Sequence, residues 1–309
     1  MFRKAGAIKL FRVVVTLSVL ALLWRTVDGP GAMDLLLAAN PVWLLAAVLA
    51  LNAQTVLSAL RWRLTARGLG QSIPVGRAVR EYYLSQIVNQ SLPGGVVGDA
   101  GRAVRARHEA GLKRAGQAVV FERLAGQLAL FGVTGAAVLL VWISPGGTGL
   151  PAWVLRLVAM TGGALLVGGL VLWAVSRRAH VWGHHVREWF DAFAVSVLAP
   201  DVLSRQIILS LATTALNLLA FALCARATGT GLPLTAVMII VPLILLTMLI
   251  PISVSGWGLR EGAAAALFPV IGATATEGFA ASFAFGLMFL VSVLPGVVIL
   301  LIHPRPQSA

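Results

Sequence analysis

The sequence is dominated by apolar stretches long enough to cross a lipid bilayer, and this feature limits the folds open to the chain. A transmembrane helix needs about 20 mostly apolar residues. Stretches of this kind cover residues 11–27, 41–60, 115–143, 152–175, 203–225, 234–252 and 279–302. A chain that crosses a bilayer in such runs satisfies its backbone polar groups as helices. The pattern therefore predicts an all-α polytopic membrane protein with seven to eight apolar helical segments in a single domain, residues 1–309.

Charged residues are too few to cover a water-soluble protein of this size. They make up 11% of the 309 residues, and the mean hydropathy is +0.90, whereas soluble domains carry about 25% charge. The net charge of +13 would suggest nucleic acid binding in a soluble protein. Here most basic residues lie between apolar stretches, which favours contact with anionic lipid and no nucleic-acid partner. Cys224 is the only cysteine, so we expect no disulfide framework, thiol metal cluster or redox pair. We also expect no cofactor.

The positions of lysine and arginine predict the orientation of the chain. Basic stretches occur at residues 1–12, 61–80, 102–114 and 177–187, and the connections 28–40 and 144–151 contain no lysine or arginine. Because cytoplasmic loops carry the excess of basic residues, we expect a multi-pass protein of a bacterial-type inner membrane with both termini in the cytoplasm. A cleaved signal peptide is the alternative for the first stretch, but Trp24-Arg25 is a poor approach to a cleavage site.

Two segments do not fit a simple crossing. Residues 75–110 have basic flanks on both sides, which predicts a re-entrant helical hairpin that opens to the cytoplasm and is broken at Pro93-Gly94-Gly95. Residues 234–271 lie between external flanks, which predicts an opposing hairpin that turns between Pro251 and Gly256. A full crossing by 234–252 is the alternative. Paired broken helices in inverted orientation form midplane sites in many transporters, although such breaks can also serve only to pack helices.

Charged side chains inside the apolar regions are the strongest functional signal. Each costs roughly 2.5–3.5 kcal/mol to insert and is usually functional. The six are Asp99, Arg102, Glu122, Arg123, Arg260 and Glu261. Glu122 and Arg123 are sequence neighbours, as are Arg260 and Glu261. Sequence neighbours on a helix do not face each other, so we expect these residues to need partners from other segments. Asp99 and Arg102, three apart, can pair locally.

The economical arrangement brings these three pairs into one polar cavity between the hairpins. The six charges sum to zero, which suits a zwitterionic headgroup, with arginines on a phosphate and carboxylates on an ammonium. Internal salt bridges that only hold the hairpins are the alternative. Glycines 94, 95, 98 and 101 precede or open a helix, an arrangement that presents backbone N–H groups to a phosphate.

Polar side chains recur every four residues before the first break, at Arg77, Glu81, Ser85 and Asn89. This stripe predicts a helix that lines a water-filled groove, or one whose outer end simply lies in water. Tyr82 and Tyr83 suit the headgroup level.

The pattern of residues 180–200 predicts an amphipathic helix in the cytoplasmic interface, with Trp189 and Phe190 on its apolar face. A metal site at the nearby histidines is disfavoured, because no carboxylate stands at a suitable spacing.

Several motifs resemble the membrane region of lysylphosphatidylglycerol synthetases, which defines a wider flippase-like family. They are Arg61-Trp62, residues 89–95, Gly98-Asp99 with Arg102, Phe121-Glu122-Arg123 with Gly126, and residues 251–261. The resemblance covers roughly residues 10–302 and implies a lipid-translocating module. It links members to aminoacylated phospholipids, polyprenyl-linked sugars and hopanoid-type lipids. The soluble synthetase domain is not expected after Ala309, so we expect no enzymatic activity.

The sequence thus predicts a translocase for anionic or zwitterionic membrane lipids. The predicted substrate site comprises Asn89, Pro93, Gly94, Gly95, Asp99, Arg102, Glu122, Arg123, Pro251, Ser253, Gly256, Arg260 and Glu261. With no ATP-binding motif, transport would be downhill or coupled to an ion gradient, with Glu122 or Asp99 as the proton carrier. The alternatives are a headgroup-modifying enzyme that uses Asp99 or Glu122 as acid or base, and a scaffold for a separately encoded lipid-modifying enzyme.

Overall fold

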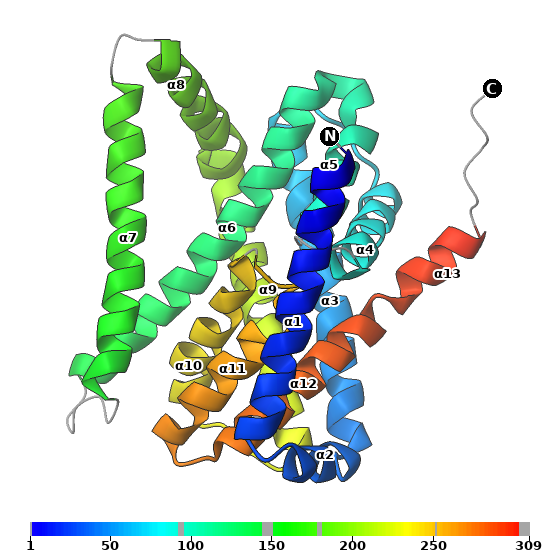
Figure 1. Ribbon diagram of the computed structural model, residues 1–309. Coiled ribbons are helices and arrows are strands. Elements are labelled where there is room, and N and C mark those ends of the chain that lie inside the picture. The colour runs from blue at the N-terminus through cyan, green and yellow to red at the C-terminus, as the bar shows by residue number, and fades with distance from the viewer. Residues whose placement is uncertain (1, 92–95, 144–150, 178–180, 251, 303–309) are drawn as a thin grey trace.

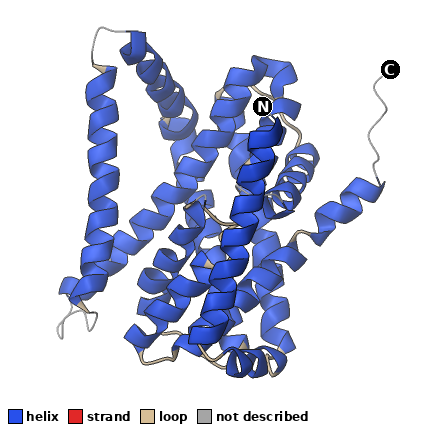
Figure 2. Ribbon diagram, viewed as in Figure 1, coloured by secondary structure: helices blue, strands red, loops and turns tan. Residues whose placement is uncertain are grey.

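A computed structural model describes residues 2–91, 96–143, 151–177, 181–250 and 252–302. Within these ranges the chain is helical and contains no strands (Figure 2). The helices are α1 (Phe2–Thr26), α2 (Gly29–Leu37), α3 (Pro41–Gly68), α4 (Val75–Ser91), α5 (Val97–Arg105), α6 (Arg107–Ile143), α7 (Ala152–Ser176), α8 (Val181–Phe193), α9 (Pro200–Ala227), α10 (Leu234–Leu246), α11 (Leu259–Leu267), α12 (Ala275–Ser292) and α13 (Leu294–Ile302). The all-α prediction is confirmed.

Five helical stretches in the described residues are long and apolar enough to cross a bilayer. They are Pro41–Gly68, Ala110–Ile143, Ala152–Ser176, Pro200–Ala227 and Ala275–Ile299. Helices α1 and α2, bent by 94° at their junction, make a sixth candidate. The apolar helix in 234–252 ends at Leu249, so at about 1.5 Å per residue it is shorter than a 30 Å hydrocarbon core.

Local sequence signals explain where these helices begin. The Asn40 side chain accepts a hydrogen bond from the Val42 N–H (2.9 Å), and Pro41 occupies the first helical position of α3. Thr274 and Glu277 form a reciprocal capping box at the start of α12. These caps satisfy backbone N–H groups that would otherwise lack partners at a helix start.

The core lies where α3 and α9 pack together, with α12 and α10 beside them (Figure 1). Leu51, Phe221 and Ile240 are almost fully buried there. Helix α6 crosses this bundle obliquely, whereas α7 stands apart from it and α13 leaves it on the other side (Figure 1). Helix α7 exposes apolar side chains such as Met160 and Leu166, which a surrounding bilayer would cover.

The basic stretches gather at one end of the molecule. In Figure 1 the N-terminus, α5 and the start of α8 lie at the upper end, whereas α2, whose connection has no lysine or arginine, lies at the lower end. The charge asymmetry along the sequence is therefore an asymmetry between the two ends of the fold.

The two broken segments each form a packed helix pair. Helices α4 and α5 pack so closely that a Cβ at Gly98 would collide with the Ser85 carbonyl oxygen. Helices α10 and α11 also pack together, and the turn between them places Ser255, Gly256 and Gly258 at φ values of 49°, 80° and 86°. The α4–α5 pair lies toward the basic end, and the α10–α11 pair lies toward the opposite end (Figure 1).

Helix α8 occupies most of the segment predicted to be amphipathic, and a short π-helical turn, Ala194–Leu198, follows it. Part of the apolar face of α8 packs against α6. The Phe121 ring of α6 packs edge-on against Trp189 (5.6 Å between centroids) and against Phe193 (5.3 Å).

Candidate functional site

Glu122 of α6 is the centre of a buried ion-pair network. Its Oε1 atom accepts hydrogen bonds from Arg61 of α3, at 2.6 Å from Nη2 and 3.2 Å from Nε. The Tyr82 hydroxyl of α4 donates to the same oxygen at 3.3 Å, and Arg102 Nη2 of α5 lies 3.4 Å from Oε2. The prediction that Glu122 finds partners on other segments is correct, since three helices supply them.

Arg102 is fully buried and held on several sides. Its guanidinium lies between the rings of Trp62 and Tyr82, 4.6 Å and 4.4 Å from their centroids. One nitrogen, Nη2, is 3.0 Å from Asp99, the local pair that the sequence predicts. Its Nε and Nη1 atoms have no hydrogen-bond partner among the described residues. The aromatic faces hold this cation in place, so Arg102 acts as a fixed element of the network.

Asp99 receives donors from three helices. Ser85 Oγ donates to it at 2.7 Å and Asn89 Nδ2 at 3.2 Å, both from α4. Arg102 of α5 and Arg123 of α6 complete the set. The Arg123 side chain is 42% exposed, whereas those of Arg61 and Arg102 are 6% and 0% exposed. Arg123 is therefore the most accessible arginine of the network.

The polar stripe on α4 faces α5 along much of its length. Glu81 forms an ion pair with Arg105, and Arg77 donates to the Arg105 carbonyl oxygen at 3.4 Å. Ser85 and Asn89 of α4 donate to Asp99 of α5. The stripe is therefore mainly a helix–helix contact. Asn89 also borders the cavity described below, whereas Arg77 and Glu81 border a separate small pocket.

A cavity of about 290 Å³ adjoins the network. Its charged lining residues are Arg61, Asp99, Glu122 and Arg123, its carboxamides are Gln54, Gln86, Asn89, Gln90, Gln127 and Asn217, and its apolar residues include Leu245, Met248, Phe285 and Phe289. The walls thus come from α3, α4, α5, α6, α9 and α12, from the end of the α10 segment and from the turn before α11. Ionisable groups, neutral amides and aromatic rings all border one space among apolar helices.

Arg260 and Glu261 form a separate buried pair that does not line this cavity. The Arg260 guanidinium binds Glu261 Oε1, and Ser282 of α12 contacts both side chains. The expectation that these sequence neighbours do not face each other is wrong, whereas the expected partner from another segment is present as Ser282. Glu261 turns back to accept the Gly258 N–H at 2.6 Å, capping α11, and the long arginine side chain reaches the carboxylate in that position. The expectation that all three pairs share one cavity is wrong for the same reason.

The turn before α11 nevertheless contacts the end of α4. Ser255, in the turn before α11, donates from Oγ to the Asn89 carbonyl oxygen in the last turn of α4, at 2.7 Å. Phe285 lines the cavity, and its ring centroid lies 5.3 Å from the Arg260 guanidinium carbon. Arg260 therefore contacts a residue of the cavity wall without reaching the cavity itself.

The remaining predicted site residues are placed as follows. Pro93, Gly94, Gly95 and Pro251 lie outside the described residues. Ser253 and Gly256 are not among the residues that line the cavity: Ser253 is 3% exposed, and Gly256 packs against Met248.

Sequence reasoning missed Arg61, Gln54, Gln127 and Asn217. The sequence places Arg61 in a basic flank, yet it donates to Thr213 of α9 at 2.8 Å inside the bundle. For the three amides, the available signal is an isolated polar residue within the apolar stretches 41–60, 115–143 and 203–225.

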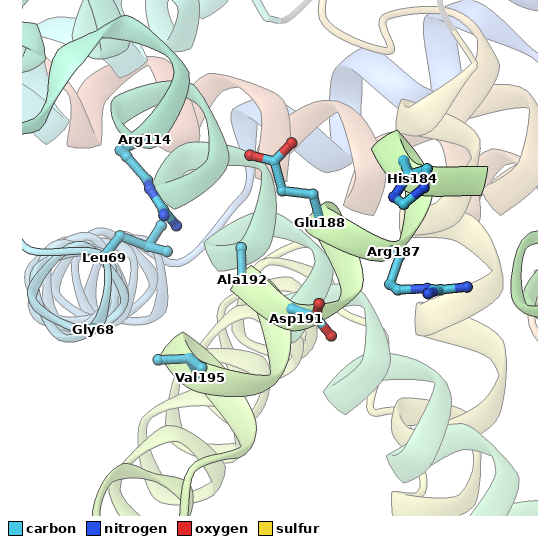
Figure 3. A pocket seen from close by; sticks show the side chains of 9 residues that line it. All are labelled: Gly68, Leu69, Arg114, His184, Arg187, Glu188, Asp191, Ala192 and Val195. Atoms are coloured by element: carbon cyan, nitrogen blue, oxygen red, sulfur yellow. The ribbon is translucent and has the colours of Figure 1, made fainter. Parts of the chain in front are cut away.

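A larger but more open pocket, of about 480 Å³, lies at the basic end (Figure 3). Figure 3 shows its walls: the end of α3, Arg114 of α6, and α8 with the turn after it. Arg187 there donates to the Ser176 carbonyl oxygen, and hydrogen bonding from Lys113 lowers the pKa of Glu188. Arg187 and Glu188 of this pocket bind neighbouring helices, so we place the candidate site at the buried network. Among the described residues, no group of three His, Cys, Asp or Glu side chains is arranged to hold a metal.

The fold and the site define a multi-pass helical membrane protein with a charged cavity between two broken helix pairs. The family described as the lysylphosphatidylglycerol synthase TM region matches residues 9–296. The chain belongs to this family, which implies a lipid-related function in a membrane. A comparison with curated proteins gave no match.

Proposed function

We propose that this protein moves a phospholipid, or another lipid with a polar headgroup, across the membrane. The carrying observation is the buried network of Arg61, Asp99, Arg102, Glu122 and Arg123 beside a cavity among apolar helices. Charges at membrane depth are costly and typically mark a substrate path. In this proposal the headgroup passes through the cavity while the acyl chains remain in the bilayer.

The arrangement of the breaks supports this path. The α4–α5 and α10–α11 pairs approach from opposite ends of the fold and touch through Ser255 and Asn89. In the proposal both pairs are re-entrant, the basic end faces the cytoplasm of a bacterial-type inner membrane, and both termini lie on that side. The chain would act as a transporter and leave headgroup chemistry to a separate enzyme.

Each charged group has a distinct part in this proposal. Arg123, the exposed arginine, would receive the phosphate of the headgroup. Arg61 and Arg102 would hold Glu122 in place, and Asn89 would hold Asp99. Arg260 and Glu261 would keep the second break in shape through Gly258 and Ser282, so they contribute to the path without touching the lipid.

Translocation of labelled phospholipids in proteoliposomes tests this function. We expect the wild-type protein to accelerate the movement of at least one anionic or zwitterionic lipid. Arg123→Gln should reduce that rate at least tenfold, and Arg156→Gln, at an exposed arginine of α7, is the matched control that should keep it. Rates equal to those of protein-free vesicles for every such lipid would contradict the proposal.

A further inference from the structure

The amides of the cavity form a second chemical region beside the ion pairs. Six lining residues are carboxamides, and α3, α4, α6 and α9 all contribute to them. Amides carry no charge, so they do not balance the arginines and carboxylates of the network. A carboxamide offers both an acceptor and donors, which is the chemistry that recognises hydroxyl groups.

Three of these amides have an unused acceptor. Asn89 is fully engaged, because it binds Asp99 and the Gly98 N–H. The side-chain oxygens of Gln54, Gln127 and Asn217, in contrast, are buried without a hydrogen-bond partner. Buried polar atoms without a partner are uncommon and require an explanation. Rotation about the last side-chain torsion, which is soft, would turn either polar end of each amide into the cavity.

The charges beside these amides favour an anion. Three arginines face two carboxylates in the network, which leaves a formal charge of +1. Each carboxylate of the described cavity wall already binds two arginines: Glu122 binds Arg61 and Arg102, and Asp99 binds Arg102 and Arg123. An ammonium group would have to compete for them, whereas a phosphate can join the exposed Arg123.

We propose that the cavity recognises a lipid whose headgroup is a phosphate joined to an uncharged polyol, such as glycerol, inositol or a hexose. Arg123 binds the phosphate, and Gln54, Gln127 and Asn217 bind the hydroxyls. The volume of about 290 Å³ lies at the lower limit for ligand pockets, which suits a headgroup without its acyl chains. The inference names the substrate class of the proposed translocase, and the recognition itself can be measured without transport.

Binding to the purified full chain in detergent tests the recognition. The probes are phosphatidylinositol, phosphatidic acid, which has the phosphate without the polyol, and phosphatidylethanolamine, which adds an ammonium. We expect phosphatidylinositol to bind most tightly. Gln54→Leu, Gln127→Leu and Asn217→Leu should each weaken its binding about three- to tenfold, the effect of one hydrogen bond. Their affinity for phosphatidic acid should stay within twofold, which also shows that they are folded.

Gln71→Leu is the matched control, because Gln71 is 2% exposed and also has an unpartnered oxygen but lies outside the cavity. It should leave all three affinities unchanged. Equal binding of phosphatidylinositol and phosphatidic acid, tightest binding of phosphatidylethanolamine, or insensitivity to the three amide variants would overturn the inference. Equal affinity for soluble inositol phosphate would overturn the assignment to a lipid. Selective binding without translocation in proteoliposomes would leave the recognition standing and overturn only the proposed transport.

Discussion

At the scale of single residues, the site is a set of side chains with different degrees of freedom. Arg102 is fixed between two aromatic rings and two carboxylates. Glu122 is equally buried and joins α3, α4 and α5 to α6. Arg123 shares Asp99 with Arg102 but is 42% exposed. The network therefore combines a rigid interior with one accessible cation.

Because Glu122 is buried between two arginines, its neutralisation should reduce stability. In Glu122→Gln the buried Arg61 and Arg102 lose a carboxylate, and we expect a loss of about 3–5 kcal/mol in the free energy of unfolding. Denaturation of the purified protein in detergent measures it. Glu188→Gln removes a solvent-exposed pair with Lys113 and should cause no measurable loss. Equal stability of the two variants would contradict the structural importance of the network.

At the scale of elements, the close approach of α5 to α4 positions the network. The contact depends on Gly98, whose missing side chain lets α5 meet the Ser85 carbonyl oxygen. It also lets the Gly98 N–H reach Asn89 Oδ1 at 2.8 Å. Asp99, the next residue, is thereby aimed at Ser85 and Asn89.

We therefore expect Gly98→Ala to separate the two helices, because the obstructing atoms belong to the backbone. The variant should lose about 1–3 kcal/mol of unfolding free energy and most of its lipid translocation. Gly101→Ala is a control in the same helix. There the nearest atom is Arg105 Nη1 at 3.0 Å, the end of a flexible side chain, so stability should be kept or slightly raised by the better helix propensity of alanine. Thermal denaturation compares the two variants, and a Gly98→Ala protein as stable as Gly101→Ala would refute the close contact.

The apolar runs and the polar exceptions within them are sufficient to predict much of the fold. The stretches at 41–60 and 203–225 correspond to α3 and α9, and Asp99 and Arg102 pair because they lie three positions apart on a helix. Arg61 could not be placed, since a basic residue at the end of a span looks the same whether it faces water or the bundle. The Arg260–Glu261 pair depends on the backbone at Gly258 (φ 86°), which composition and periodicity do not specify.

At the scale of the whole molecule, the basic end and the placement of the α4–α5 and α10–α11 pairs toward opposite ends give the fold a direction. The orientation predicts that Ser72→Cys, between α3 and α4, reacts with an impermeant maleimide only from the cytoplasmic side. Gly231→Cys, between α9 and α10, should react only from the other side. Both positions are exposed, and the native Cys224 is buried and should give little background. Labelling of both positions from the same side would contradict the orientation.

Passage of the headgroup through the cavity is the central claim, and a plug placed in the cavity tests it most directly. In a Cys224→Ala background, Gln127→Cys puts a thiol in the cavity wall, and Leu128→Cys puts one on the exposed side of the same helix, where the leucine is 58% exposed. Both are modified with a bulky maleimide, and lipid translocation in proteoliposomes is measured before and after. The account predicts that modification abolishes translocation at position 127 and leaves it unchanged at position 128. Undiminished translocation by the modified Gln127→Cys protein would contradict it.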